Sequence, residues 1–121
     1  MKFAAGLAIV LCSAMPATSA VITYECQFDY RIDLDGKTEE PFPLTFKIDT
    51  TSHRAFMEGN VGIVDVEFFV GDEALSFIEK VASGAIQTTT IARDGWAVHS
   101  RNTVLLGEII AAQHFGCCVP E

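Results

Sequence analysis

The stretch 84–107, GAIQTTTIARDGWAVHSRNTVLLG, constrains the fold more than any other part of the chain. Residues 85–92 are rich in Thr and Ile, and residues 96–106 are rich in β-branched and aromatic side chains, with Asp94-Gly95 between the two runs. Asp-Gly in this setting is a strong hairpin signal, because the favoured type I′ turn needs positive φ at both central residues. The stretch therefore predicts two antiparallel strands joined by a tight turn.

The length of this turn decides which side chains share a face. We expect an even loop of two or four residues, because it gathers Ile91, Trp96 and Val98 on one apolar face. A three-residue loop with a glycine bulge would exchange the faces of one strand, since side chains alternate with period two. With the even loop, one face carries Gln87, Thr89, Ile91, Trp96, Val98 and Ser100, and the other carries Ile86, Thr88, Thr90, Ala97, His99 and Arg101.

Most of the remaining chain follows the same period of two. From Tyr24 to Ile32, apolar side chains alternate strictly with polar or charged ones, which predicts a strand with its apolar face, Tyr30 and Ile32 included, in the core. Turn signals recur every eight to twelve residues, among them Asp35-Gly36. The pattern predicts an all-β domain of about seven or eight antiparallel strands, either a β-sandwich or a small barrel.

One segment, Glu73 to Ala82, fits two structures. Asp72 would cap a helix in which Leu75, Ile78 and Ala82 have helical spacing. As a strand, Leu75, Phe77 and Glu79 would share one face. We expect the strand, because every neighbouring segment is a strand with a short connection.

The first twenty residues have the composition of a signal peptide. A positive start at Lys2 is followed by the uncharged apolar run 3–12 and then by small residues, with Thr18 and Ala20 spaced for cleavage. The apolar run is shorter than the ~20 residues that a membrane-spanning helix needs. We therefore expect a signal peptide over 1–20, a single β-domain over 21–121 with no transmembrane segment, and a secreted or periplasmic location.

The charge of the chain limits its partners. Without Lys2, seven Lys and Arg stand against sixteen Asp and Glu, which gives a net charge of −9. Such a surface repels phosphate backbones, so the composition argues against nucleic-acid binding and favours a basic protein as partner.

Three cysteines remain after cleavage, and export favours a disulfide between Cys26 and one of the two cysteines near the C-terminus. Alternation places Cys117 on the same side as Phe115 and Val119, which favours a bond from Cys26 to Cys117. A kink at Gly116 would reverse the alternation and select Cys118 instead. Either bond leaves one thiol over.

The sequence offers little for catalysis. Neighbouring strand residues point to opposite faces, so His99 and Ser100 cannot act as base and nucleophile. No His or Cys pair has the spacing of a metal site, and we expect no metal, no cofactor and no enzyme. The best candidate for a binding face is formed by Thr90, His99 and Arg101, which the even loop would place together.

Three segments carry a resemblance to a known group of proteins. GAIQTTTI, GWAVHSR and the closing Gly116 to Cys118 resemble a family of small exported bacterial β-proteins of uncharacterised function, over most of the domain. The resemblance implies no activity. It does imply the strand over Glu73 to Lys80, and it makes Cys118 the disulfide partner of Cys26.

These observations predict an exported binding domain of unknown ligand. A basic partner protein, such as an envelope enzyme that the domain inhibits, suits the charge of −9. The alternative is a structural or self-associating envelope protein with no small-molecule ligand. An open cavity between the strands would indicate a carrier, whereas a filled core would move the site to the surface.

Overall fold

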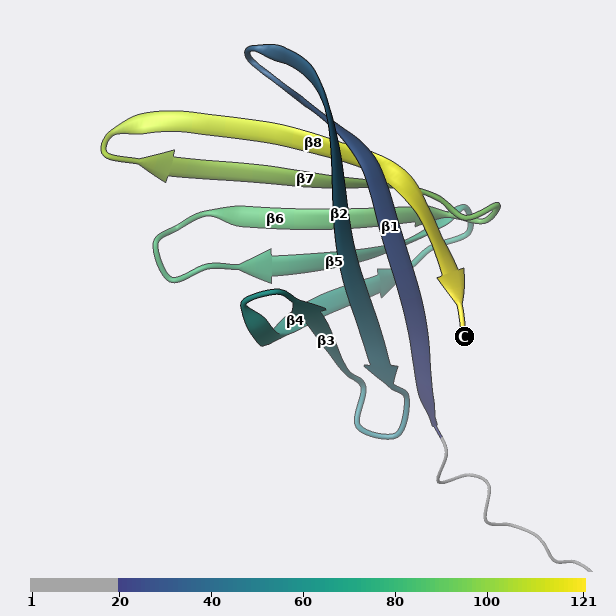
Figure 1. The fold of residues 1–121 in the computed structure, drawn as a ribbon. Coiled ribbons are helices and arrows are strands. Elements are labelled where there is room, and N and C mark those ends of the chain that lie inside the picture. Colours follow the sequence, from purple (N-terminus) through teal and green to yellow (C-terminus); the bar gives the residue numbers. More distant parts are fainter. Residues whose placement is uncertain (1–19) are drawn as a thin grey trace, which may run out of the picture.

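The computed structural model describes residues 20–121, and the first nineteen residues of the predicted signal peptide lie outside this range. The described chain is a closed barrel of eight antiparallel strands, each paired with its neighbour along the chain, with the last strand paired to the first (Figure 1). The strands are β1 (Val21–Asp33), β2 (Gly36–Asp49), β3 (Arg54–Gly59), β4 (Gly62–Val70), β5 (Ala74–Lys80), β6 (Ile86–Ala92), β7 (Trp96–Leu105) and β8 (Glu108–Pro120).

The predicted all-β fold is confirmed, and of the two predicted architectures, β-sandwich or small barrel, the protein adopts the barrel. The strand interpretation of residues 73–82 is confirmed as well, since β5 occupies most of that segment. In the part of the chain that the structure describes, no helix has the length and hydrophobicity that crossing a membrane requires.

The barrel has two different ends. At the hairpin end, the chain turns between β1 and β2, β3 and β4, β5 and β6, and β7 and β8. The terminal end holds the other three connections together with residues 20 and 121 (Figure 1, where the C-terminus is marked). The β7–β8 hairpin projects past its neighbour at the hairpin end, because β6 stops pairing with β7 at Asn102 while β8 continues to Leu105.

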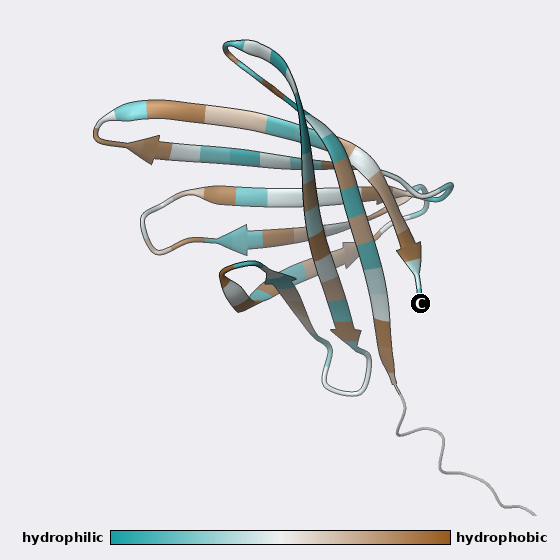
Figure 2. Ribbon diagram, viewed as in Figure 1, coloured by the Kyte–Doolittle hydropathy of each residue, from teal (hydrophilic) through white to brown (hydrophobic). Residues whose placement is uncertain are grey.

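Phenylalanine rings fill the middle of the barrel. Phe28, Phe46 and Phe77 are at most 1% exposed, and the rings of Phe46 and Phe77 stack with their centroids 4.2 Å apart. Apolar and polar residues alternate along the strands, as the bands in Figure 2 show. A filled middle leaves the two ends and the outer wall as the places where a partner can bind.

A bulge at Asp29 reverses the faces of β1. Relative to β8, β1 carries one extra residue here, and side chains beyond it point to the opposite face. Tyr30 therefore stacks on Phe115 at a centroid distance of 5.3 Å, Ile32 is 42% exposed, and Arg31 points inward. The expectation that Tyr30 and Ile32 continue the buried face of this strand is wrong.

The central hairpin has a three-residue loop. Thr89 pairs with His99 and Ile91 pairs with Ala97, so the loop consists of residues 93–95, and its glycine has a φ of 99°. The even loop expected from the sequence is therefore wrong, and the glycine-bulge alternative is the one that forms. The inward side chains are Gln87, Thr89, Ile91, Ala97, His99 and Arg101.

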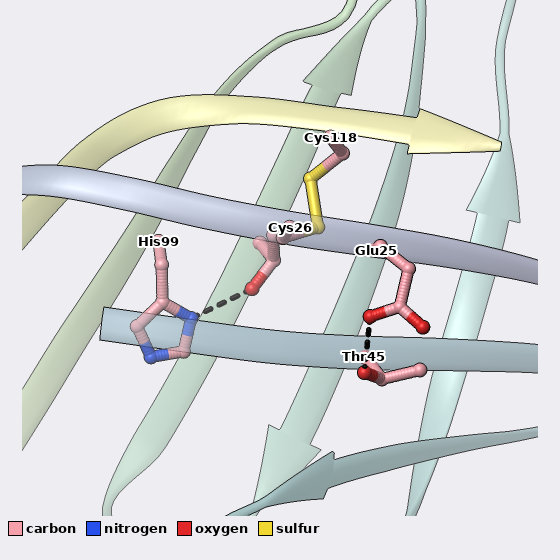
Figure 3. The surroundings of a disulfide bond; sticks show 6 residues. Glu25, Cys26, Thr45, His99 and Cys118 are labelled. Atoms are coloured by element: carbon pink, nitrogen blue, oxygen red, sulfur yellow. Dashed lines mark hydrogen bonds between the residues drawn. A yellow bond between two sulfur atoms is a disulfide. The ribbon is translucent and has the colours of Figure 1, made fainter. Parts of the chain in front are cut away.

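The first and last strands are joined covalently. Cys26 and Cys118 are partners in the β1–β8 register and form a disulfide (Figure 3), the pairing that the resemblance implies. Cys117 is exposed and unbonded. Alternation selects Cys118 without any kink, because the side that includes Cys117 faces outward rather than into the core.

Gly116 lies where β8 approaches β1 most closely. An added Cβ would lie 2.0 Å from the carbonyl oxygen of Gln27 and 2.5 Å from the Cα of Phe28, both of which are backbone atoms. No side chain fits there, so a glycine at this position is what lets the barrel close beside the disulfide.

Candidate functional site

His99, on β7, is held by two hydrogen bonds in the half of the barrel near the hairpin end. The side chain is 1% exposed, with Nδ1 2.6 Å from Oγ1 of Thr89 and Nε2 3.1 Å from Oε1 of Gln87. An amide oxygen only accepts, so Nε2 of His99 donates to Gln87, and Nδ1 accepts from the Thr89 hydroxyl. The network fixes a neutral imidazole and turns the amide nitrogen of Gln87 away from it.

The surroundings of His99 oppose its protonation. Burial lowers its pKa to about 4, and the nearby His114 and Arg101 act in the same direction. His99 is therefore neutral at pH 7, in agreement with a hydrogen-bond network in which one ring nitrogen accepts.

His114 lies beside His99 on β8 but has no such network. It is 3% exposed, and neither ring nitrogen has a hydrogen-bond partner among residues 20–121. Its ring packs against Phe42 at a centroid distance of 4.6 Å and lies 5.9 Å from the ring of His99. Burial, and then the guanidinium of Arg101, lower the pKa of His114. Two buried unpaired nitrogens carry a cost in stability.

Three polar side chains form a row across the inner face at this end. Glu79 on β5 pairs with Gln87 on β6, which pairs with Arg101 on β7. All three line a pocket of about 270 Å³. The rest of its lining consists of Phe42, Leu44, Met57, Gly59, Asn60, Val61, Gly62 and Val64.

Neither charged member of this row is paired. Among the described residues, Glu79 and Arg101 have no ion pair within 4.0 Å and no side-chain hydrogen bond. Arg31, which also points inward at this end, is different: it bridges Asp33 and Glu40. These contacts raise the pKa of Arg31, chiefly through the hydrogen bond to Asp33.

The structure separates the residues of the predicted binding face. His99 and Arg101 do share the inner face of β7, but Thr90 pairs with Val98 and points the other way, where its hydroxyl lies 2.8 Å from that of Ser76. The prediction that Thr90, His99 and Arg101 share one face depended on the even loop and is wrong. Thr89 and Gln87, rather than Thr90, share the inner face with His99 and Arg101.

The outer wall at the terminal end carries a second feature, the Trp96 patch. Trp96 is the single tryptophan of the chain, is 59% exposed and pairs with the exposed Cys117. Val119, also 59% exposed, pairs with Glu25. We define the patch as Trp96, Cys117, Val119, Glu25 and Glu121.

Two carboxylates lie close together in this patch. The hydrogen bond and the charge of Glu25 raise the pKa of Glu121, and Glu25 also accepts a hydrogen bond from Thr45 at 2.8 Å (Figure 3). Like charges this close repel each other, and a cation from a partner would relieve the repulsion.

The sequence had missed Glu79, Gln87 and His114 as members of one site. For Glu79 a signal was available, because its carboxylate shares a strand face with the apolar Leu75 and Phe77, and a charge on an apolar face often marks a site. No group of three or more His, Cys, Asp or Glu within residues 20–121 is arranged to hold a metal ion. Comparison with protein-family models, curated proteins and solved structures gave no match.

Proposed function

We propose that this chain is an exported binding domain that acts on a basic partner protein through the Trp96 patch. The observation that carries the proposal is an exposed tryptophan on the same outer face, two strands away from a pair of neighbouring carboxylates. Tryptophan is enriched among the residues that dominate binding energy at interfaces, and its ring attracts cations such as an arginine guanidinium.

The filled middle of the barrel supports a binding surface rather than a ligand enclosed at the centre of the barrel. Phe28, Phe46 and Phe77 occupy the space that a carrier would leave open. A net charge of −9 on the domain would speed its encounter with a basic protein and orient the two. The disulfide and the signal-like first twenty residues both suit a protein that works outside the cytoplasm.

Isothermal titration calorimetry against a basic probe protein, such as a c-type lysozyme, tests the proposal. The Cys117→Ser background prevents mixed disulfides. We expect binding at low ionic strength that weakens as salt is added, and at least tenfold weaker binding after Trp96→Ala, as for a central interface residue. Lysozyme activity in the same mixtures shows whether binding inhibits the enzyme.

Glu25→Gln supplies the charge arm of the test, and Glu108→Gln at the hairpin end is its matched control. Both remove one negative charge, but only Glu25 lies in the patch. Equal effects of the two changes, or unchanged binding by Trp96→Ala, would show that the patch is not the interface.

The second candidate is self-association, and the exposed thiol of Cys117 favours it. Light scattering at high protein concentration with and without reductant distinguishes the two. A dimer that reductant or Cys117→Ser abolishes supports self-association, and a monomer under all conditions excludes it.

A further inference from the structure

We propose that the pocket at the hairpin end binds a small zwitterion with an apolar side chain, of which an apolar α-amino acid is the simplest example. This site lies on the inner face at the opposite end from the Trp96 patch and does not depend on the function proposed for that patch. Its support comes from how Glu79, Gln87 and Arg101 are arranged around a single pocket.

Two opposite charges line this pocket without meeting each other. Glu79 on β5 and Arg101 on β7 are separated by one strand, β6, which carries Gln87 between them. Two strand spacings place their Cα atoms roughly 10 Å apart. The residue next to Glu79 on β5 does have a partner, since Lys80 bridges Glu67 at 2.6 Å on the outer face. Glu79 and Arg101 thus leave between them a place for a molecule that carries both charges in the reverse order.

Gln87 supplies the polarity between the two charges. Its oxygen accepts from Nε2 of His99, so its amide nitrogen is the group left to donate, and this nitrogen has no partner in the described chain. A carboxylate can then accept from Arg101 and Gln87 together, and hydrogen bonds to a charged group are the stronger kind. An ammonium group beside that carboxylate would face Glu79.

The remainder of the pocket suits an apolar side chain. Phe42, Leu44, Met57 and Val64 form the wall opposite the polar row. The volume of about 270 Å³ falls just below the ~300–1,000 Å³ of pockets for drug-sized ligands, which favours a small molecule.

A ligand with only one charge fits less well. A simple carboxylate would pair with Arg101 but would lie near the carboxylate of Glu79, and a simple amine would have the opposite problem. A zwitterion satisfies both residues, so the arrangement discriminates by repulsion as well as by attraction.

Titration of the ¹⁵N-labelled protein by NMR, with three ligands of one carbon skeleton, tests this inference. The ligands are leucine, 4-methylpentanoate, which lacks the ammonium group, and 3-methylbutylamine, which lacks the carboxylate. We expect leucine to shift the amide signals of β5, β6 and β7 near the pocket, and each single-charge analogue to bind at least tenfold more weakly.

Two variants assign the charges. Arg101→Gln should weaken leucine binding at least tenfold and abolish the preference for leucine over the amine, and Glu79→Gln should abolish the preference for leucine over the carboxylate. These changes in preference are readouts that a general loss of structure would not produce. Arg54→Gln, which breaks an exposed ion pair with Asp65, and Glu108→Gln are the matched controls and should leave binding unchanged.

Several results would overturn the inference. One is that leucine at millimolar concentration shifts no amide signals of the unsubstituted protein although its spectrum is well dispersed. Others are shifts confined to the terminal end, a carboxylate or an amine that binds as tightly as leucine, or leucine binding that Arg101→Gln leaves intact.

Discussion

The two halves of the barrel interior are built on the same strands but from different chemistry. Near the terminal end, the inward residues are apolar and the disulfide closes the wall. Near the hairpin end, the same inward faces of β5 to β8 carry charged, amide and imidazole groups. Leu75 and Glu79 lie on one face of one strand, as do Ala97 and Arg101.

This difference shows that a strand can keep its alternation and still change its role along its length. Period two decides only which side chains point inward. Whether those positions build a core or a site depends on the distance from the filled middle. The terminal half therefore accounts for stability, and the hairpin half holds groups whose hydrogen-bonding capacity is not all used within the barrel.

The largest test of this contrast is removal of the disulfide. Replacing Cys26 and Cys118 by Ser together releases a loop with a sequence separation of 92 residues. In the chain-entropy model the free energy of unfolding falls by about 4–5 kcal/mol. Urea denaturation measures the loss, with Cys117→Ser as the exposed control expected to change stability little. A loss no larger than that of the control would show that the terminal half is not the stabilising one.

Lowering the pH should reduce the stability of the fold through His99, in the half of the barrel near the hairpin end. Its pKa is about 4 in the folded protein and about 6.5 in the unfolded chain, so the unfolded state takes up the proton first as the pH falls. Stability from this residue is present above pH 6.5 and declines between pH 6.5 and 4, by about 3 kcal/mol in total. Urea denaturation at several pH values measures it, and His99→Gln should show a correspondingly flatter profile over that range.

The two buried histidines should respond oppositely to replacement by leucine. His99→Leu leaves Thr89 and Gln87 without their partner and should cost about 2 kcal/mol, within the usual range for buried groups that lose a hydrogen bond. His114→Leu removes two unpaired nitrogens and should stabilise the fold by about 1 kcal/mol. Thermal and urea denaturation give both signs. Destabilisation by His114→Leu would mean that His114 has a favourable role which the geometry does not show.

The smallest effect concerns the projecting β7–β8 turn. Leu106 and Gly107 have φ values of 53° and 83°, as a two-residue type I′ turn requires, and Leu106 is 96% exposed. Leucine is unfavourable in this conformation and asparagine is well suited to it, so Leu106→Asn should stabilise by about 0.5 kcal/mol. Differential scanning calorimetry can measure the shift, with Leu34→Asn as a control in another exposed turn.

The sequence was sufficient to predict the strands but not every face. Alternation and turn residues identified β1 to β8, including the uncertain β5. The predicted inward faces were wrong where a single residue decides them. The bulge at Asp29 reverses which side chains point inward at the end of β1, and the three-residue loop before Trp96 does the same for one strand of the central hairpin. Both depend on backbone geometry that composition does not reveal.

The candidate site was the least predictable part. Only the inner face of β7, with His99 and Arg101, was anticipated, and Thr90 was assigned to it wrongly. Glu79 and Gln87 join Arg101 through register between strands, and His114 comes from the far end of the chain. Such neighbours are set by pairing across the sheet, which a single sequence specifies only indirectly.

The bond between Cys26 and Cys118 also determines where the closed sheet can come apart. The disulfide holds β1 and β8 together, so local opening of the barrel must break the pairing between other strands. The shortest ladder, Glu67–Val70 against Leu75–Ile78, lies opposite that line in the strand order. Hydrogen exchange should accordingly be fastest between β4 and β5, so that the molecule parts on the side facing away from its sulfur bridge.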